Sequence, residues 1–145
     1  MLSSTVAYIL APLLALAGAA KHVDVMASYA APEKKGASPA VVVSLLPLEP
    51  DIRVNENPAP RLKLDAAQKV LVYEPPKKAS GAFPDPDNPR YLDPQIPVRF
   101  EVGLAEGASR GSHAVKATVT YFYCSKRQGW CRKGAQDVEL AVAVP

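Results

Sequence analysis

Alternating apolar and polar residues mark the C-terminal third of the chain. In residues 98–104 the apolar side chains fall on one face, and Arg99 and Glu101 fall on the other. The run from 115 to 123 repeats this alternation, with valine, alanine and tyrosine opposite lysine and threonine, and residues 138–144 continue it. A period of two residues is typical of a half-buried strand. We therefore predict a strand in each of these three segments.

Shorter apolar runs rich in β-branched residues precede these segments. They are residues 41–46, 61–64 and 69–73. Turn-forming residues separate the runs, and only residues 64–69 have the composition of a helical turn. Six or seven short strands with almost no helical period predict an all-β fold, an immunoglobulin-like antiparallel β-sandwich over residues 40–145.

The segment from Pro75 to Pro97 interrupts the strand pattern. It contains seven prolines, and proline cannot donate a hydrogen bond to a sheet. We therefore expect a loop. Ordered loops of this length are often functional, although a rigid connection without a further task is equally compatible with the composition.

The N-terminal residues have the outline of a secretory signal. An almost uninterrupted apolar run covers residues 6–20. The run is shorter than a membrane-spanning helix, which needs about 20 apolar residues. It ends in Ala17-Gly18-Ala19, the small-x-small pattern that signal peptidase accepts, although no lysine or arginine precedes it. We expect residues 1–19 to be a signal peptide and the mature protein to be periplasmic or secreted. An uncleaved N-terminal anchor is the alternative.

The residues after the signal, 20–39, are small, polar and contain proline, so we expect a flexible tether there. The net charge of +3 is spread along the chain without a block of lysine and arginine. Nucleic acid is therefore not an expected partner. We expect a monomer with no stable membrane insertion after cleavage.

Two cysteines, Cys124 and Cys131, lie on either side of a six-residue turn. In an oxidising compartment they are expected to form one disulfide. The eight-residue ring that this closes contributes only about 2 to 3 kcal/mol in the loop-closure model. Positive charge nearby favours the thiolate, which points to exchange chemistry, but charged residues in an exposed turn are commonly only solvated. The four cations are Lys126, Arg127, Arg132 and Lys133. A structural disulfide and a redox-active pair both remain open.

The segment from 119 to 142 reads Val-Thr-Tyr-x-x-Cys, a short turn, Gly-aromatic-Cys and a Val-x-Leu strand. This pattern resembles the N-terminal periplasmic domain of the thiol:disulfide interchange protein DsbD, in which the cysteine pair lies at this hairpin of an immunoglobulin-like sandwich. A similar ending occurs in the C-terminal β domain of NHL-repeat thioredoxin-like proteins. The DsbD resemblance also extends to chain order, because a proline-rich stretch precedes a Pro-Val-x-Phe strand where the DsbD domain carries a cap loop.

The resemblance implies an exported thiol–disulfide exchange module that passes electrons through Cys124 and Cys131, which would make it a thiol:disulfide oxidoreductase. Its partners would be thioredoxin-like exported proteins or a membrane electron carrier. The alternative is a non-catalytic β-sandwich interaction module in which the disulfide only pins a hairpin. The residues that the resemblance places as shielding or flanking the pair are Phe83, Tyr121, Tyr123 and Trp130.

Three features depart from the DsbD pattern. The turn has six intervening residues where the DsbD domain usually has five. The motif Val-Asn-Glu-Asn-Pro at 54–58 is closer to the NHL-associated version, and the 145 residues hold neither a transmembrane electron carrier nor a thioredoxin domain. These departures bear on catalysis, because the fold of the NHL-type domains does not establish them as reductases.

Other chemistry has little support in the sequence. His22 and His113 are far apart, so no metal site is expected, and no cofactor is expected either. We find no Ser-His-Asp arrangement and no phosphate-binding glycine loop.

Overall fold

The computed structural model describes residues 21–75 and 84–145, which form strands joined by turns and loops. Within these two ranges there is no helix, and the prediction of an all-β fold is confirmed. Where a helical turn was expected at 64–69, a hydrogen-bonded turn follows a strand instead, and the side chain of Gln68 bonds the backbone of Val70 and Leu71.

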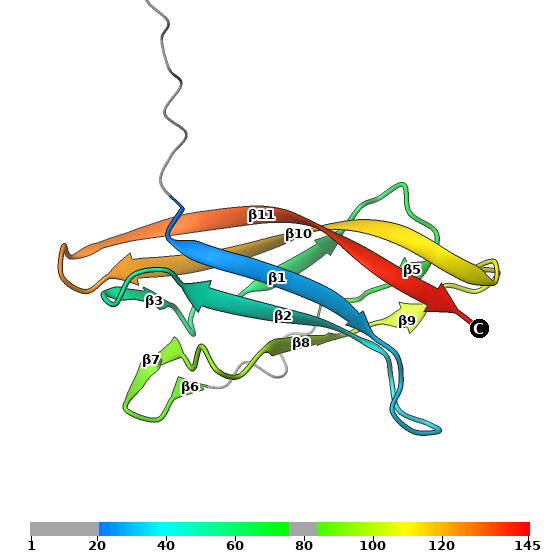
Figure 1. Cartoon of the computed structure of the whole chain (residues 1–145), viewed down its shortest axis with the longest axis horizontal. Helices are drawn as coiled ribbons and strands as arrows, with labels where there is room; N and C mark the ends of the chain where they lie inside the picture. The colour runs from blue at the N-terminus through cyan, green and yellow to red at the C-terminus, as the bar shows by residue number, and fades with distance from the viewer. Residues whose placement is uncertain (1–20, 76–83) are drawn as a thin grey trace, which may run out of the picture.

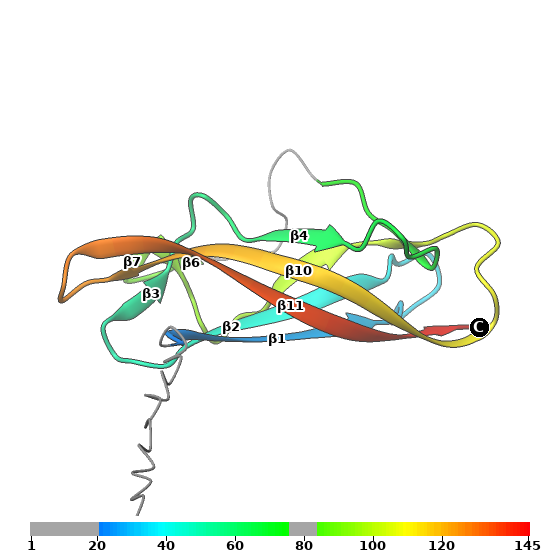
Figure 2. The ribbon, with the colours of Figure 1, turned by 90° about the horizontal axis from the view of Figure 1, so that it is seen from above.

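The strands form two main antiparallel sheets. The first contains β1 (Val23–Ala30), β2 (Ala40–Pro47) and β8 (Val98–Glu101), in the order β1-β2-β8. The second contains β11 (Trp130–Val144) and β10 (Gly111–Ser125), and the far edge of β10 pairs with both β3 (Ile52–Val54) and β4 (Arg61–Leu64). The β10–β11 hairpin lies above the β1–β2 hairpin in Figure 1, and the two overlap in Figure 2, so they form two layers.

Two short ribbons complete the described part of the chain. One pairs β5 (Leu71–Val72) with β9 (Gly103–Leu104), and the other pairs β6 (Pro84–Asp85) with β7 (Asn88–Leu92). The β6–β7 ribbon lies at the same end of the molecule as β3 and the β10–β11 turn (Figure 1). An isolated bridge between Asn55 and Tyr91 connects the ribbon to the segment after β3.

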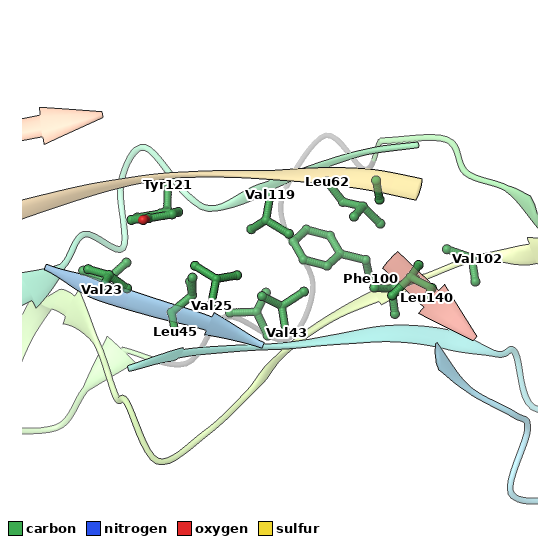
Figure 3. Packing of buried hydrophobic residues seen from close by; sticks show 14 of the residues in the cluster. Val23, Val25, Val43, Leu45, Leu62, Phe100, Val102, Val119, Tyr121 and Leu140 are labelled. Atoms are coloured by element: carbon green, nitrogen blue, oxygen red, sulfur yellow. The ribbon is translucent and has the colours of Figure 1, made fainter. Parts of the chain in front are cut away.

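The core fills the space between the two layers. Val119 and Tyr121 point from β10 toward Val25, Val43 and Leu45 of the facing sheet (Figure 3). Around Val119 in β10 the inward residues alternate with threonines, whereas in β2 apolar residues such as Val42 and Leu46 also occupy alternate positions. Successive side chains of a strand point to opposite faces, so each strand turns one face inward. Burying a side chain of this kind contributes about 1.5 to 3 kcal/mol, so the inward faces hold the layers together and confirm an antiparallel sandwich. The immunoglobulin-like strand order stays a prediction.

The expectation of a flexible tether over residues 20–39 is wrong for residues 23–30, which form β1. This strand pairs with β2 along its whole length, and Val23 and Val25 are 1% and 8% exposed. The pattern is hard to recognise because small residues, Ala27 among them, continue the inward face after the two valines. Backbone pairing with β2 and burial of that face order the segment.

The expectation of a loop from Pro75 to Pro97 is wrong for the β6–β7 ribbon. Pro84 begins β6, and Pro89 lies exposed in a ribbon of only two strands. Proline is tolerated at such edge positions because its missing N–H leaves no buried ladder bond unmade. The other described parts of this segment form turns and loop.

Candidate functional site: the Cys124–Cys131 disulfide

The register of the β10–β11 hairpin places the two cysteines directly opposite each other. Cys124 and Cys131 are paired residues with their Cα atoms 4.0 Å apart, and their sulfurs form a disulfide. The predicted disulfide between the two cysteines is therefore confirmed. The strands continue one pair beyond the cysteines, to Ser125 and Trp130, so the loop proper has four residues, 126–129, and not six.

Local hydrogen bonds close this tight loop. The N–H of Gly129 donates to the carbonyl oxygen of Ser125 at 2.9 Å, and the N–H of Gln128 donates to Ser125 Oγ at 3.0 Å. Gly129 has a φ of 71°, a left-handed conformation that glycine adopts without the steric cost of a Cβ. These contacts fix the turn that aligns the two sulfurs.

Asp51 ties the hairpin tip to the segment before β3. Its carboxylate accepts a hydrogen bond of 2.6 Å from Ser125 Oγ, and its carbonyl oxygen accepts one of 2.9 Å from the N–H of Lys126. The hydrogen bond from Ser125 lowers the pKa of Asp51 below its usual value of 3.8, with a smaller contribution from Arg127, whose Nε lies 3.9 Å from the carboxylate. The residue after Cys124 is thus held from two sides.

The disulfide lies on the face of the hairpin that is turned away from the core. Successive side chains of a strand point to opposite faces, so Cys124 points away from the core side occupied by Tyr121 and Tyr123. Cys124 is nevertheless buried, with 6% of its surface exposed, whereas Cys131 on the edge strand is exposed. The two sulfurs therefore differ in their access to a partner.

Both cysteines line a pocket of about 480 Å³ between the segment after β3 and the β6–β7 ribbon. The other lining residues are Asn55, Glu56, Asn57, Pro89, Arg90 and Tyr91. A backbone hydrogen bond of 2.9 Å from Glu56 N–H to the carbonyl oxygen of Arg90 holds the two walls together. Segments more than thirty residues apart in the chain therefore meet over the buried sulfur.

One polar side chain of the pocket touches the buried sulfur. Asn55 Oδ1 lies 3.2 Å from Cys124 Sγ. The sulfur of a disulfide carries no hydrogen, so in this oxidised state the pair is a close polar contact. After reduction the thiol of Cys124 has an acceptor in place, because an S–H group donates weakly to an amide oxygen.

The four predicted cations surround the hairpin tip in different ways. Lys126 Nζ lies 5.8 Å from the ring centroid of Tyr91, and the guanidinium of Arg132 lies 4.1 Å from the ring centroid of Trp130. Both are cation–π distances. Arg127 is exposed and close to Asp51, and Lys133 is exposed on β11. The four cations therefore lie at the hairpin tip, and two of them are oriented by aromatic rings.

The aromatic residues expected to flank the sulfurs pack on the core side of the hairpin. Tyr123 lies between Tyr121 and Trp130, with ring centroids 5.8 Å from each. His22, just before β1, contacts Tyr123 and Trp130 at 5.9 and 5.3 Å, and its Nδ1 lies 2.8 Å from Glu49. These rings pack against the core-facing side of the hairpin tip. None of them lines the pocket that contains Cys124 and Cys131.

The structure brings two of the predicted site residues together, Cys124 and Cys131, and adds two that the sequence analysis did not select, Asn55 and Tyr91. The position of Asn55 inside the motif at 54–58 is the one signal that pointed to it. Phe83, expected as the shielding aromatic, lies outside the described residues.

Residues 21–75 and 84–145 contain no group of three or more histidine, cysteine or acidic side chains that would hold a metal ion. Over the same ranges no helix is long and apolar enough to cross a membrane. Comparison with protein-family models gives no match for this chain, and neither the curated proteins nor the solved structures yield a significant match.

Proposed function

We propose that this protein is an exported thiol–disulfide exchange module that passes electrons between thioredoxin-like partners through Cys124 and Cys131. The observation that carries the proposal is the unequal burial of the two sulfurs: Cys131 is exposed and Cys124 is 6% exposed. A disulfide that only staples a hairpin has no need of one open sulfur beside a pocket.

The unequal burial defines the order of bond changes. A partner thiolate attacks the exposed Cys131 Sγ, a mixed disulfide forms, and the Cys124–Cys131 bond breaks with its electron pair remaining on Cys124 Sγ. A second thiolate of the partner then attacks the partner's own sulfur in the mixed disulfide and releases Cys131 as a thiolate. The partner dithiol becomes a disulfide and the pair in this protein becomes a dithiol, and the reverse sequence returns the electrons.

The charges at the hairpin tip support this chemistry. Lys126 and Lys133 stand close to the cysteines in the chain, and positive charge favours the thiolate over the thiol. The same charges attract an approaching thiolate, which carries a negative charge. Both effects lower the barrier to exchange in either direction.

The apolar run and the Ala17-Gly18-Ala19 site support export, and an oxidising compartment is where such a disulfide forms. If the signal is cleaved, the intact mass of the exported protein corresponds to a chain that begins at Ala20. A membrane-bound form that retains Met1 would favour the uncleaved anchor.

Exchange with a defined probe tests the proposal. Reduced thioredoxin mixed with the oxidised full chain should reduce the pair within seconds to minutes. A Cys124→Ser variant activated at Cys131 as its mixed disulfide with 5-thio-2-nitrobenzoate should then form a trapped mixed disulfide with a thioredoxin that lacks its resolving cysteine, with release of the thionitrobenzoate. The Cys131→Ser variant, with only the buried thiol, is the matched control and should trap little. Reduction that requires hours, or equal trapping by both variants, would support the non-catalytic interaction module.

A further inference from the structure

Besides its disulfide bond, the buried sulfur has a contact of hydrogen-bond length with the side-chain amide of Asn55. Asn55 follows β3, and its backbone N–H donates to the carbonyl oxygen of Phe122 at 2.8 Å, which fixes the residue beside β10. Its side-chain oxygen then reaches Cys124 Sγ at 3.2 Å. Within residues 21–75 and 84–145 the contact with Cys124 is the one hydrogen-bond-length contact of this side chain.

We propose that Asn55 is a catalytic residue of the exchange reaction, whose side-chain amide stabilises Cys124 Sγ in the reduced states. The inference rests on the proposed function, since it assigns a role in the step at which the Cys124–Cys131 bond breaks. When a partner thiolate attacks Cys131 Sγ, Cys124 Sγ leaves with the electron pair of the broken bond and becomes a thiolate. That charge develops in a buried position, where it needs a hydrogen-bond donor more than it would in water.

An amide serves both protonation states of the leaving sulfur. A half-turn about the Cβ–Cγ bond exchanges the positions of Oδ1 and Nδ2, and the N–H then donates to the thiolate. Once Cys124 takes up a proton from water, its S–H donates to Oδ1 in the orientation that the structure shows. A carboxylate has no donor and a methyl group has neither function, so the amide is the side chain of this size that fits both states.

Stabilising the reduced states makes a disulfide easier to reduce, because the reduction potential measures the free-energy difference between dithiol and disulfide. Asn55 is therefore predicted to raise the potential of the pair and to lower the pKa of the Cys124 thiol. A residue that only supports the fold would change neither quantity while the protein remains folded.

Three variants of the full chain separate these possibilities. Asn55→Leu removes donor and acceptor at nearly constant volume, and Asn55→Asp keeps the shape but brings a negative charge to the sulfur. Gln95→Glu is the control, because Gln95 is exposed, lies outside the pocket and gains the same negative charge. Circular dichroism and the melting temperature establish which variants are folded.

The measurements are the equilibrium with a glutathione redox buffer and, in a Cys131→Ser background, the pKa of Cys124 from the ultraviolet absorbance of the thiolate. Asn55→Leu and Asn55→Asp should each disfavour the dithiol about tenfold, which is about 30 mV for a two-electron couple, and raise the Cys124 pKa by about 1 unit. Gln95→Glu should stay within about twofold of the wild type, as expected for a solvated charge away from the pocket.

If Asn55→Leu does not fold, the isosteric Asn55→Asp carries the test. Equilibrium constants and Cys124 pKa values equal to those of the wild type in the folded Asn55 variants would overturn the assignment. The wild-type potential is a separate result: a very low value would count against the exchange function and leave the effect of Asn55 on Cys124 intact.

Discussion

Ser125 is the buried polar residue that connects the disulfide to the rest of the fold. It is 2% exposed, directly follows Cys124, and donates to Asp51 while its oxygen also accepts from the turn. A buried hydroxyl without partners would be costly, so this position requires both contacts. The result is a cysteine whose backbone is held from its C-terminal side.

Ser125→Ala should therefore destabilise the protein in a pH-dependent way. The hydrogen bond lowers the pKa of Asp51 below 3.8 in the folded state, so the stabilisation is fully present above about pH 4 and is lost as the pH falls through the lowered folded pKa. In the variant the pKa of Asp51 should rise toward 3.8. Carbon-detected NMR titration of the Asp51 carboxylate and thermal unfolding of both proteins at several pH values measure the two effects.

Ser112→Ala is a suitable control for this prediction, because Ser112 lies on the same strand and is exposed. It should leave the Asp51 titration unchanged. A stability difference between Ser125→Ala and the wild type that is the same at pH 7 and pH 2 would contradict the role given to the hydrogen bond with Asp51.

At the scale of the elements, the β10–β11 hairpin depends on one cross-strand pair near the disulfide. Tyr121 lies opposite Gly134, and its ring covers the glycine so closely that a Cβ at position 134 would come 2.7 Å from Tyr121 Oη. Tyr121 is 7% exposed and belongs to the core, so its ring has little room to move. This pair determines how closely β10 and β11 pack, three residues along each strand from the disulfide-bonded cysteines.

Gly134→Ala should consequently cost about 1 to 3 kcal/mol of unfolding free energy, the usual range for overpacking a filled site. Urea unfolding gives this value. In a Tyr121→Leu background, which removes the ring, the same alanine substitution should cost almost nothing. An equal cost in both backgrounds would mean that the ring does not determine the effect.

The strands whose alternation is strong were predictable. β8, β10 and β11 have one buried and one solvent-facing side, so burial imposes a clear period of two on the sequence. In β1 alanine and serine weaken that contrast, and in β6–β7 prolines hide strands that exist only as an edge ribbon. Neither of these elements could be recognised without its pairing partner.

The candidate site was predictable to the extent that it is local. Cys124 and Cys131 are seven residues apart on one hairpin, so their pairing follows from the turn between them. The contact between Asn55 and Cys124 spans 69 residues, and Tyr91 reaches the pocket through the β6–β7 ribbon. Contacts of this kind depend on how the sheets and ribbons pack, which periodicity along the chain does not reveal.

At the scale of the whole molecule, the disulfide is a small part of what holds the sandwich together. β10 and β11 pair along fifteen residues each, and the core between the layers contains none of the ring's loop residues. The ring that the disulfide closes is worth about 2 to 3 kcal/mol in the loop-closure model. The fold is thus expected to survive reduction, as an exchange module requires.

The double variant Cys124→Ser/Cys131→Ser should accordingly fold to the same all-β structure with a modestly lower melting temperature. Far-ultraviolet circular dichroism and thermal unfolding, compared with the wild type in the presence and absence of a reductant, provide the measurement. Reduced wild type and double variant should melt at similar temperatures. A double variant that is unfolded at room temperature would assign the disulfide a structural role.

The central claim, that the disulfide exchanges electrons, is tested most directly by its reduction potential. Structural disulfides of exported proteins typically lie below about −300 mV, whereas thioredoxin-like exchange partners lie between about −270 and −120 mV. The exposed Cys131, the nearby cations and the small ring all favour a bond that is easily attacked and readily reduced. Equilibration of the full chain with glutathione or thioredoxin is predicted to give a value above about −300 mV. A potential well below that limit would contradict the account and leave the pair as a structural staple.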